Sequence, residues 1–156
     1  MGVVFAYLFL YTGLSCKFVG TLEKKDFCYQ SLAVKNNKVE ICDNIKNDYS
    51  LEHCYKRVAT FFGDEYICRT LPILEENGQT IKNDCFLEVA LRNIDTSICQ
   101  NIPADVRGKF GTRDYCYVVV GIEKKDPSIC DEMSGGYVSK EICIKRINSG
   151  SNEIME

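Results

Sequence analysis

The sequence contains no tryptophan and only one histidine, His53. No two cysteines are closer than 12 residues, so the C-x2–4-C pairs of zinc sites and the C-x-x-C motif of thiol oxidoreductases are absent. The sequence also has no G-x-S-x-G, H-E-x-x-H or phosphate-binding glycine motif. Its acidic residues are scattered and do not single out a general acid/base pair. These absences predict a protein that is not an enzyme and that binds neither a metal ion nor a cofactor.

A strong charge of one sign is also lacking. The net charge of the 156 residues is −3, which argues against nucleic acid as a partner. Hydrophobic residues make up 46% of the chain and charged residues 26%, as in a folded soluble protein with a core of its own.

One apolar run stands out, at residues 3–14, but it is too short to span a bilayer core, which needs about 20 residues. Its length is typical of the apolar region of a secretory signal, and Gly13 and Ser15 would be the small residues before a cleavage site at Cys16. A membrane-proximal tether, lipidation of Cys16 and a buried first helix of the domain are the alternatives. We interpret residues 1–15 as a signal-like or membrane-proximal segment of a secreted or cell-surface protein.

The ten cysteines are the most informative feature of the chain, and their even number suits a disulfide framework. Such a set belongs in an oxidising compartment, whereas in a reducing cytosol it would indicate a metal or redox protein. Four pairs share a spacing of 14 residues, namely Cys28 and Cys42, Cys54 and Cys68, Cys85 and Cys99, and Cys116 and Cys130. The gaps around these pairs vary from 12 to 17 residues, so a unit of fixed length alternates with a loop of variable length.

Alignment on the first cysteine of each pair shows an internal repeat, with a truncated fifth copy at Cys143. An acid or Asn stands two residues before this cysteine, an aromatic residue or Ile one residue after it, and Ala or Gly five residues after it in the full copies. The residues concerned are Asp26, Glu52, Asn83, Asp114 and Glu141; Tyr29, Tyr55, Phe86, Tyr117 and Ile144; and Ala33, Ala59, Ala90 and Gly121. An isoleucine directly precedes each second cysteine, and an aliphatic residue or Met follows it by three.

These offsets predict two helices in each unit. The first cysteine and the residues one, four, five and eight positions later form one stripe on a helix. The small residue lets a neighbouring helix come close, and the acid before the cysteine suits a helix start. Asp64, Asp95 and Asp126 stand four residues before a second cysteine as N-caps of a shorter helix, with Pro127 at its first position. We therefore expect an all-α fold of tandem two-helix repeats, a short α-solenoid or helical array stapled by disulfides.

The repeat sets the expected domain organisation. A repeat domain covers residues 16–148, with units at about 26–51, 52–82, 83–113 and 114–140, a partial unit at 141–148, and a polar tail at 149–156. The D-x-C-Y and I-C pattern between Asp26 and Ile147 resembles the uncharacterised cysteine-rich α-helical repeats of secreted archaeal proteins. It is more distantly similar in architecture to tetratricopeptide and Sel1-like repeats, whose consensus sequences it lacks. The resemblance implies an extracytoplasmic repeat fold and carries no activity with it.

The spacing also favours one pairing of the cysteines. Facing residues of an antiparallel helix pair are equidistant from the turn, and pairs that straddle the loops have their midpoints within loops. This scheme uses every cysteine, as Cys16–Cys28, Cys42–Cys54, Cys68–Cys85, Cys99–Cys116 and Cys130–Cys143. The alternative scheme pairs cysteines within units, such as Cys28 with Cys42, and leaves Cys16 and Cys143 over.

The leading functional hypothesis is an extracytoplasmic protein-interaction or scaffolding module, which has a protein partner or associates with itself. A structural subunit of a surface layer or filament is the alternative, and a cytosolic thiol protein that binds metal or senses redox state is a third. The recurring aromatic residues form a core layer or line a concave ligand surface. The longer loops, at residues 72–82 and 103–112, are the other candidate positions for function.

We predict that all ten cysteines of the native protein are oxidised. Alkylation of the unfolded, unreduced protein should then add no label in intact-mass spectrometry, whereas reduction before alkylation should label every cysteine. Labelling without reduction would favour the cytosolic thiol hypothesis instead.

Overall fold

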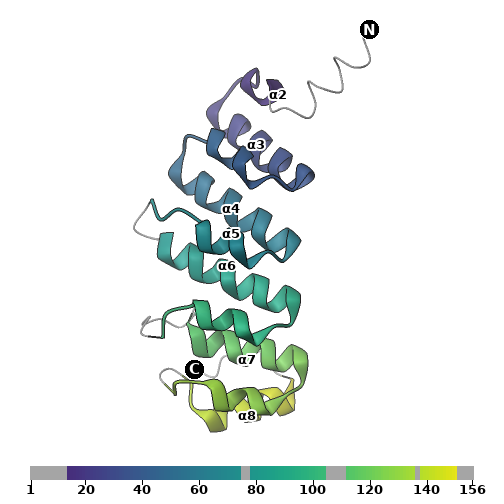
Figure 1. Cartoon of the computed structure of the whole chain (residues 1–156), viewed down its shortest axis with the longest axis vertical. Coiled ribbons are helices and arrows are strands. Elements are labelled where there is room, and N and C mark those ends of the chain that lie inside the picture. The colour runs from purple at the N-terminus through teal and green to yellow at the C-terminus, as the bar shows by residue number, and fades with distance from the viewer. Residues whose placement is uncertain (1–13, 75–77, 105–111, 136–137, 151–156) are drawn as a thin grey trace. The chain divides into compact units, whose positions relative to one another are not determined.

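Long and short helices alternate along the chain in a computed structural model (Figure 1). The structure describes residues 14–74, 78–104, 112–135 and 138–150. All regular structure in these ranges is helical, which confirms the predicted all-α class. The chain divides into two compact units, Met1–Lys82 and Asn83–Glu156, and the division falls inside helix α6 (Gly78–Asn93). The stacking of all the repeats into one solenoid or array stays a prediction.

The first unit begins with a very short helix and then alternates long with short ones. Its elements are α2 (Leu14–Lys17), α3 (Leu22–Asn36), the 3-10 helix η1 (Val39–Asn44), α4 (Asp48–Phe62) and α5 (Glu65–Thr70). Helix α3 packs against α2, η1 and α4, and α4 also packs against η1 and α5. The long helix α3, the short helix η1 that follows it and the next long helix α4 therefore all pack against one another.

The second unit repeats this arrangement. After α6 it contains the 3-10 helix η2 (Thr96–Asn101), α7 (Arg113–Lys124), the 3-10 helix η3 (Pro127–Glu132) and α8 (Lys140–Ser149). Helix α7 packs against η2, η3 and α8, and α8 packs against η3. A buried cluster holds these helices together, formed by Val118, Ile122, Cys130, Val138, Cys143 and Ile147.

The sequence predicts that the acid two residues before the first cysteine begins each long helix, and this prediction is wrong. The N-caps are Thr21, Asn47, Thr112 and Ser139, whose side chains each accept a hydrogen bond from the backbone N–H three residues later. Asp26 and Glu52 lie more than one turn inside α3 and α4, because these helices begin earlier than expected. Asp114 and Glu141 do lie in the first turn of their helices, next to the actual caps.

Two of the acids that stand two residues before the first cysteine, Glu52 and Asp114, hydrogen-bond to a distant loop. Glu52 is fully buried, and its Oε1 accepts a hydrogen bond of 2.6 Å from the backbone N–H of Leu74, 22 residues later. Asp114 is 3% exposed, and its Oδ1 accepts bonds from the backbone N–H and hydroxyl of Ser134 at 2.9 and 3.0 Å. Each carboxylate thus binds the loop that follows the next short helix. Charge-assisted hydrogen bonds of this kind are stronger than hydrogen bonds between neutral groups.

The short helices begin where the sequence predicts. Asp64, Asp95 and Asp126 are their N-caps, and each side chain accepts a hydrogen bond from the backbone N–H two residues later. Pro127 lies in the first turn of η3, where its missing N–H has no helical partner to lose.

Each long helix that continues into a short one ends in the same left-handed turn. The residue nine positions after the first cysteine has positive φ in four units, at Asn37, Gly63, Ile94 and Lys125. The next residue donates its N–H to the carbonyl of the small residue, for example from Asp64 to Ala59 at 3.0 Å. This is a Schellman-type C-cap, in which backbone N–H groups after the helix donate hydrogen bonds to carbonyls that have no partner within the helix.

The small residue also permits close helix packing, as the sequence suggests. Ala33, Ala59 and Ala90 are fully buried. A Cβ added to Gly121 would lie 2.6 Å from Cδ1 of Ile147, so the side chain of Ile147 on α8 occupies the space that a methyl group on α7 would need.

We predict that Asp114→Ala destabilises the protein, because it removes the buried carboxylate that accepts hydrogen bonds from the N–H and hydroxyl of Ser134. Such a loss costs about 1–3 kcal/mol. The free energy of unfolding in urea, measured with the disulfides intact, checks this. Glu123→Ala is the matched control on the exposed face of α7, and it should change stability by less than about 0.5 kcal/mol. Equal stabilities of the two variants would contradict the role of Asp114.

We predict that Ile94→Asn stabilises the protein. Ile94 is β-branched and has a φ of 51°, a conformation that costs an L-residue about 1–2 kcal/mol. The side chain is 47% exposed, so its removal loses little burial, and Asn37 already occupies the equivalent turn. Thermal unfolding should show a higher Tm for this variant. The reverse change, Gly63→Ile, should lower the Tm, and a fall for both variants would show that packing of Ile94 outweighs its strain.

Candidate functional site

Disulfides connect the helices across their loops. Cys16–Cys28, Cys42–Cys54, Cys99–Cys116 and Cys130–Cys143 are bonded, with Cα–Cα distances of 5.6 to 5.9 Å. Cys68 and Cys85 are disulfide-bonded as well, and none of the ten cysteines, all of which the structure describes, is free. The alternative pairing within a unit, Cys28 with Cys42, is wrong because each of these cysteines has a different partner. The oxidised state also leaves no thiol for the metal or redox hypothesis.

The aromatic residues one position after the first cysteine belong to the core. Tyr29, Phe86 and Tyr117 are 3–6% exposed, so the alternative of an open ligand surface lined by this set is wrong. Tyr55 is half-buried, and its hydroxyl donates a hydrogen bond of 2.8 Å to Oδ1 of Asp43. Burial, followed by this hydrogen bond, raises the pKa of Tyr55 to about 12. A neutral, hydrogen-bonded phenol of this kind is structural and has no role as a proton carrier near neutral pH.

Other predicted features fall partly or wholly outside the described residues. The signal-like segment at residues 1–15 is described only for Leu14 and Ser15, and the polar tail only for Ser149 and Gly150. The loops at residues 72–82 and 103–112 are also described in part, and in the first of them Ile73 and Leu74 are about half exposed. Within the described ranges, no helix is long and apolar enough to cross a membrane, and no cluster of His, Cys, Asp and Glu could hold a metal ion.

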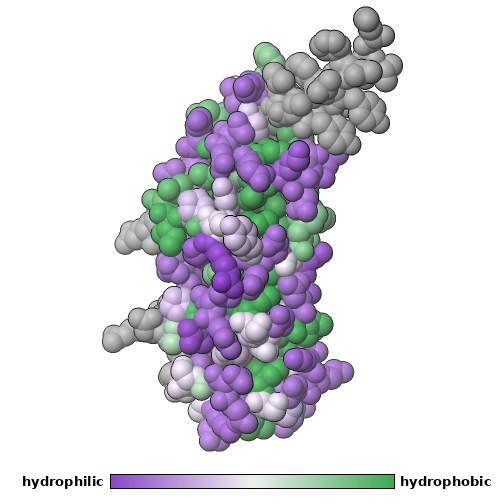
Figure 2. Space-filling view, viewed as in Figure 1, coloured by the Kyte–Doolittle hydropathy of each residue, from purple (hydrophilic) through white to green (hydrophobic). Residues whose placement is uncertain are grey.

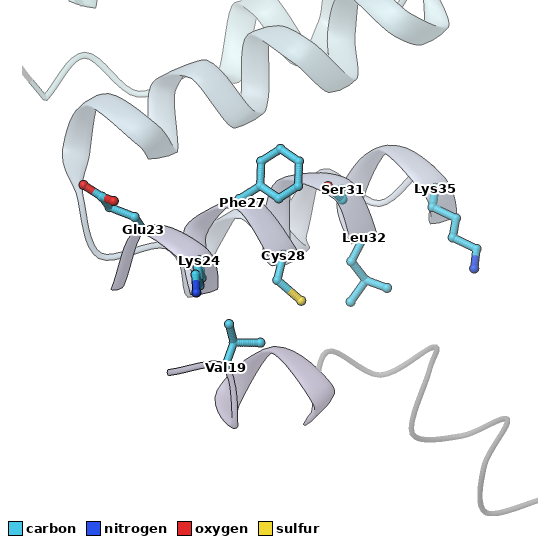
Figure 3. Close-up of a pocket in the computed structure, with 8 residues that line it drawn as sticks. All are labelled: Val19, Glu23, Lys24, Phe27, Cys28, Ser31, Leu32 and Lys35. Carbon is cyan, nitrogen blue, oxygen red and sulfur yellow. The ribbon is translucent and has the colours of Figure 1, made fainter. Parts of the chain in front are cut away.

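An apolar groove lies between α2 and α3 in the first unit, and we call it the α2–α3 groove (Figure 3). Its volume is about 620 Å³, and it is lined by Val19, Glu23, Lys24, Phe27, Cys28, Ser31, Leu32 and Lys35. Val19 follows α2 and points toward α3, from which Cys28 and Leu32 point back toward it. Lys24 and Lys35 lie along α3 toward the two ends of the groove, so charged groups border its apolar floor.

Exposed hydrophobic residues surround the α2–α3 groove. Phe27 is 63% exposed, and nearby in the chain Phe18 and Leu22 are 75% and 68% exposed. Hydrophobic side chains also reach the surface elsewhere, among hydrophilic ones (Figure 2), and Tyr66 and Phe61 are 68% and 53% exposed. Phe27 differs from these residues in that it lines a groove.

The second unit contains a smaller, polar hollow of about 270 Å³ between η2, α7 and η3. Its lining includes Gln100, Tyr117 and Glu132, and the pKa of Tyr117 is raised, first by burial and then by the charge of Glu132. The hydroxyl of Ser128 donates to its own N-cap, Asp126, and thereby lowers the pKa of that carboxyl. These groups satisfy one another, and the hollow shows no nucleophile activated by a base.

The chain matches no known protein family model, and no curated protein or solved structure is similar to it. Function therefore has to be argued from the site itself. The α2–α3 groove could not be found from the sequence, because Phe27 stands directly before the first cysteine, at a position where the copies of the repeat do not share a residue type. A signal was nevertheless present: Val19 follows Cys16 by three residues, as Ile45 follows Cys42.

Proposed function

We propose that the protein is an extracytoplasmic interaction or scaffolding module that binds protein through the α2–α3 groove. The disulfide-bonded helical frame fits an extracellular, disulfide-stabilised protein. The observation that carries the proposal is the open apolar groove beside Phe27.

The shape and lining of the groove favour an α-helix as its occupant. The groove runs between two helices, and the internal packing of the same unit places a long helix against a short helix and another long helix. An amphipathic helix would bury its apolar side on Val19, Phe27 and Leu32, and its polar side would face the lysines of the rim. The bridge between Cys16 and Cys28 fixes the two walls, so little ordering is needed on binding.

Comparative capture tests this proposal. The immobilised, oxidised protein should retain proteins from an extracytoplasmic fraction, and Phe27→Asp should lose them by placing a charge on the apolar wall. Tyr66→Asp is the matched control, because Tyr66 is an aromatic residue of the same unit with 68% exposure and lies outside the groove lining. Retention of the same proteins by all three surfaces would refute binding through the groove.

The second candidate function is a structural subunit of a surface layer or filament. It follows from the repeat in the sequence, because repeats with exposed end faces can stack between molecules as well as within them. Ordered polymers of the oxidised protein in electron micrographs would support it.

A further inference from the structure

One of the five disulfides is more accessible than the others. Nine of the ten cysteines are at most 2% exposed, whereas Cys28 is half-buried. Cys28 lines the α2–α3 groove, and its side chain points from α3 toward α2 (Figure 3). Its partner, Cys16, is fully buried. A reagent that enters the groove can therefore reach Cys28, whereas the cysteines of the other four disulfides are enclosed by the core.

This difference in exposure decides which disulfide reacts with a thiol. Thiol–disulfide exchange begins with the attack of a thiolate on one of the two sulfurs, so its rate depends on access to that sulfur. Exposed disulfides are the labile and regulatory ones. A disulfide within the core reacts with a reagent in solution when the structure around it opens.

The charges of the groove also favour the attack of a thiolate. The charged residues of its lining are Lys24, Lys35 and Glu23, so two cations stand against one carboxylate. A thiolate is an anion, and a cleft of net positive charge raises its local concentration.

The Cys16–Cys28 disulfide carries much of the attachment of α2 to the first unit. Helix α2 has 4 residues, a single turn that is not stable on its own. In the described residues α2 packs against α3, whereas η1 and η3 each pack against two long helices. Val19, which follows α2 and forms part of the groove lining, is only partly buried. Loss of the disulfide would therefore leave α2 with little packing of its own to hold it.

We infer that the Cys16–Cys28 disulfide is a thiol–disulfide exchange site, which a dithiol reductant reaches through the α2–α3 groove and whose reduction releases α2 from α3. Since α2 and α3 form the two walls of the groove, reduction would also abolish binding there. The inference rests on the proposed function in this last respect, and it names the regulation of the same site.

The exchange is a two-electron reaction in two steps. A thiolate of the dithiol attacks Sγ of Cys28, the bond between the two cysteines breaks, and its electron pair leaves on Sγ of Cys16, which takes up a proton. The second thiol of the reductant then loses its proton and attacks the mixed disulfide, and Cys28 leaves as a thiolate that is protonated in turn. The dithiol ends as a disulfide, and Cys16 and Cys28 end as two thiols.

Reduction of the folded, oxidised protein by dithiothreitol tests the inference. Samples are quenched with acid at intervals and alkylated, and peptide mapping then gives a rate for each disulfide. We expect Cys16–Cys28 to be reduced at least about tenfold faster than the other four. One common rate for all five disulfides would overturn the inference, because access to Cys28 would then give this disulfide no advantage.

A matched pair of variants tests the route through the groove. Ser31 is an exposed residue of the groove lining, three positions after Cys28. A long side chain on a helix points back over the preceding turn, so Ser31→Trp should cover Cys28 and slow reduction of its disulfide roughly tenfold. Arg57→Trp is the control, because Arg57 is exposed three positions after Cys54 and lies outside the groove lining. Equal rates for Cys16–Cys28 in both variants would refute this route.

Limited proteolysis tests the release of α2. Lys17 is an exposed residue of α2, and trypsin should cleave after it at least about tenfold faster once Cys16–Cys28 alone is reduced and alkylated. The double variant Cys16→Ser/Cys28→Ser, which carries no alkyl groups, should behave in the same way. Cleavage after Lys46 is the internal control, because this exposed residue follows η1, whose disulfide stays intact. Unchanged cleavage after Lys17 in the double variant would show that α2 stays in place, against the inference.

The failure of this inference is distinguishable from that of the proposed function. Selective reduction of Cys16–Cys28 and release of α2, with no capture of any protein by the oxidised form, would support the inference and refute the proposed function. Capture that Phe27→Asp abolishes, by a protein whose five disulfides are reduced at one rate, would do the reverse. Capture that is the same for the double variant and the oxidised protein would overturn the predicted loss of the groove.

Discussion

The buried disulfide across each loop is the interaction on which the rest of this structure depends. Nine of the ten cysteines are at most 2% exposed and Cys28 is half-buried, so the bridges are both covalent links and parts of the hydrophobic interior. The second helix of each unit has only six residues and could not hold its position by packing alone. Each bridge closes a short loop, worth about 3 kcal/mol in the chain-entropy model, and it fixes that helix against the next long one.

The bridges alone do not set the orientation of the loops, and buried polar groups do this instead. Glu52 and Asp114 reach across to backbone N–H groups about twenty residues later, and the carbonyls of the small residues accept from the turn that ends each long helix. A buried carboxylate is unfavourable unless it is hydrogen-bonded, so its position allows few loop conformations. The combination explains how loops of different length can leave the helix packing unchanged.

Much of this fold could be predicted from the sequence, because the repeat aligns positions that share one physical role. The constant 14-residue spacing, the Asp N-caps of the short helices and the alanine at the tight helix contact all follow from that alignment. The N-caps of the long helices could not be predicted, since Thr21 and Thr112 lie at different distances from their cysteines. The α2–α3 groove could not be predicted either, because the exposure of Phe27 depends on how α2 and α3 pack against each other and not on the residue type at that position.

The disulfides also have a consequence for how the chain acquires its covalent structure. Each of the four bridges described individually joins neighbouring cysteines in the sequence, with separations of 12 to 17 residues, and no loop encloses another. An oxidant that simply joined each newly emerging cysteine to the one waiting before it, starting at Cys16, would produce these bonds without later exchange. The order in which the cysteines emerge is then itself the information that selects the native bonds, and the chain needs little help from a disulfide isomerase.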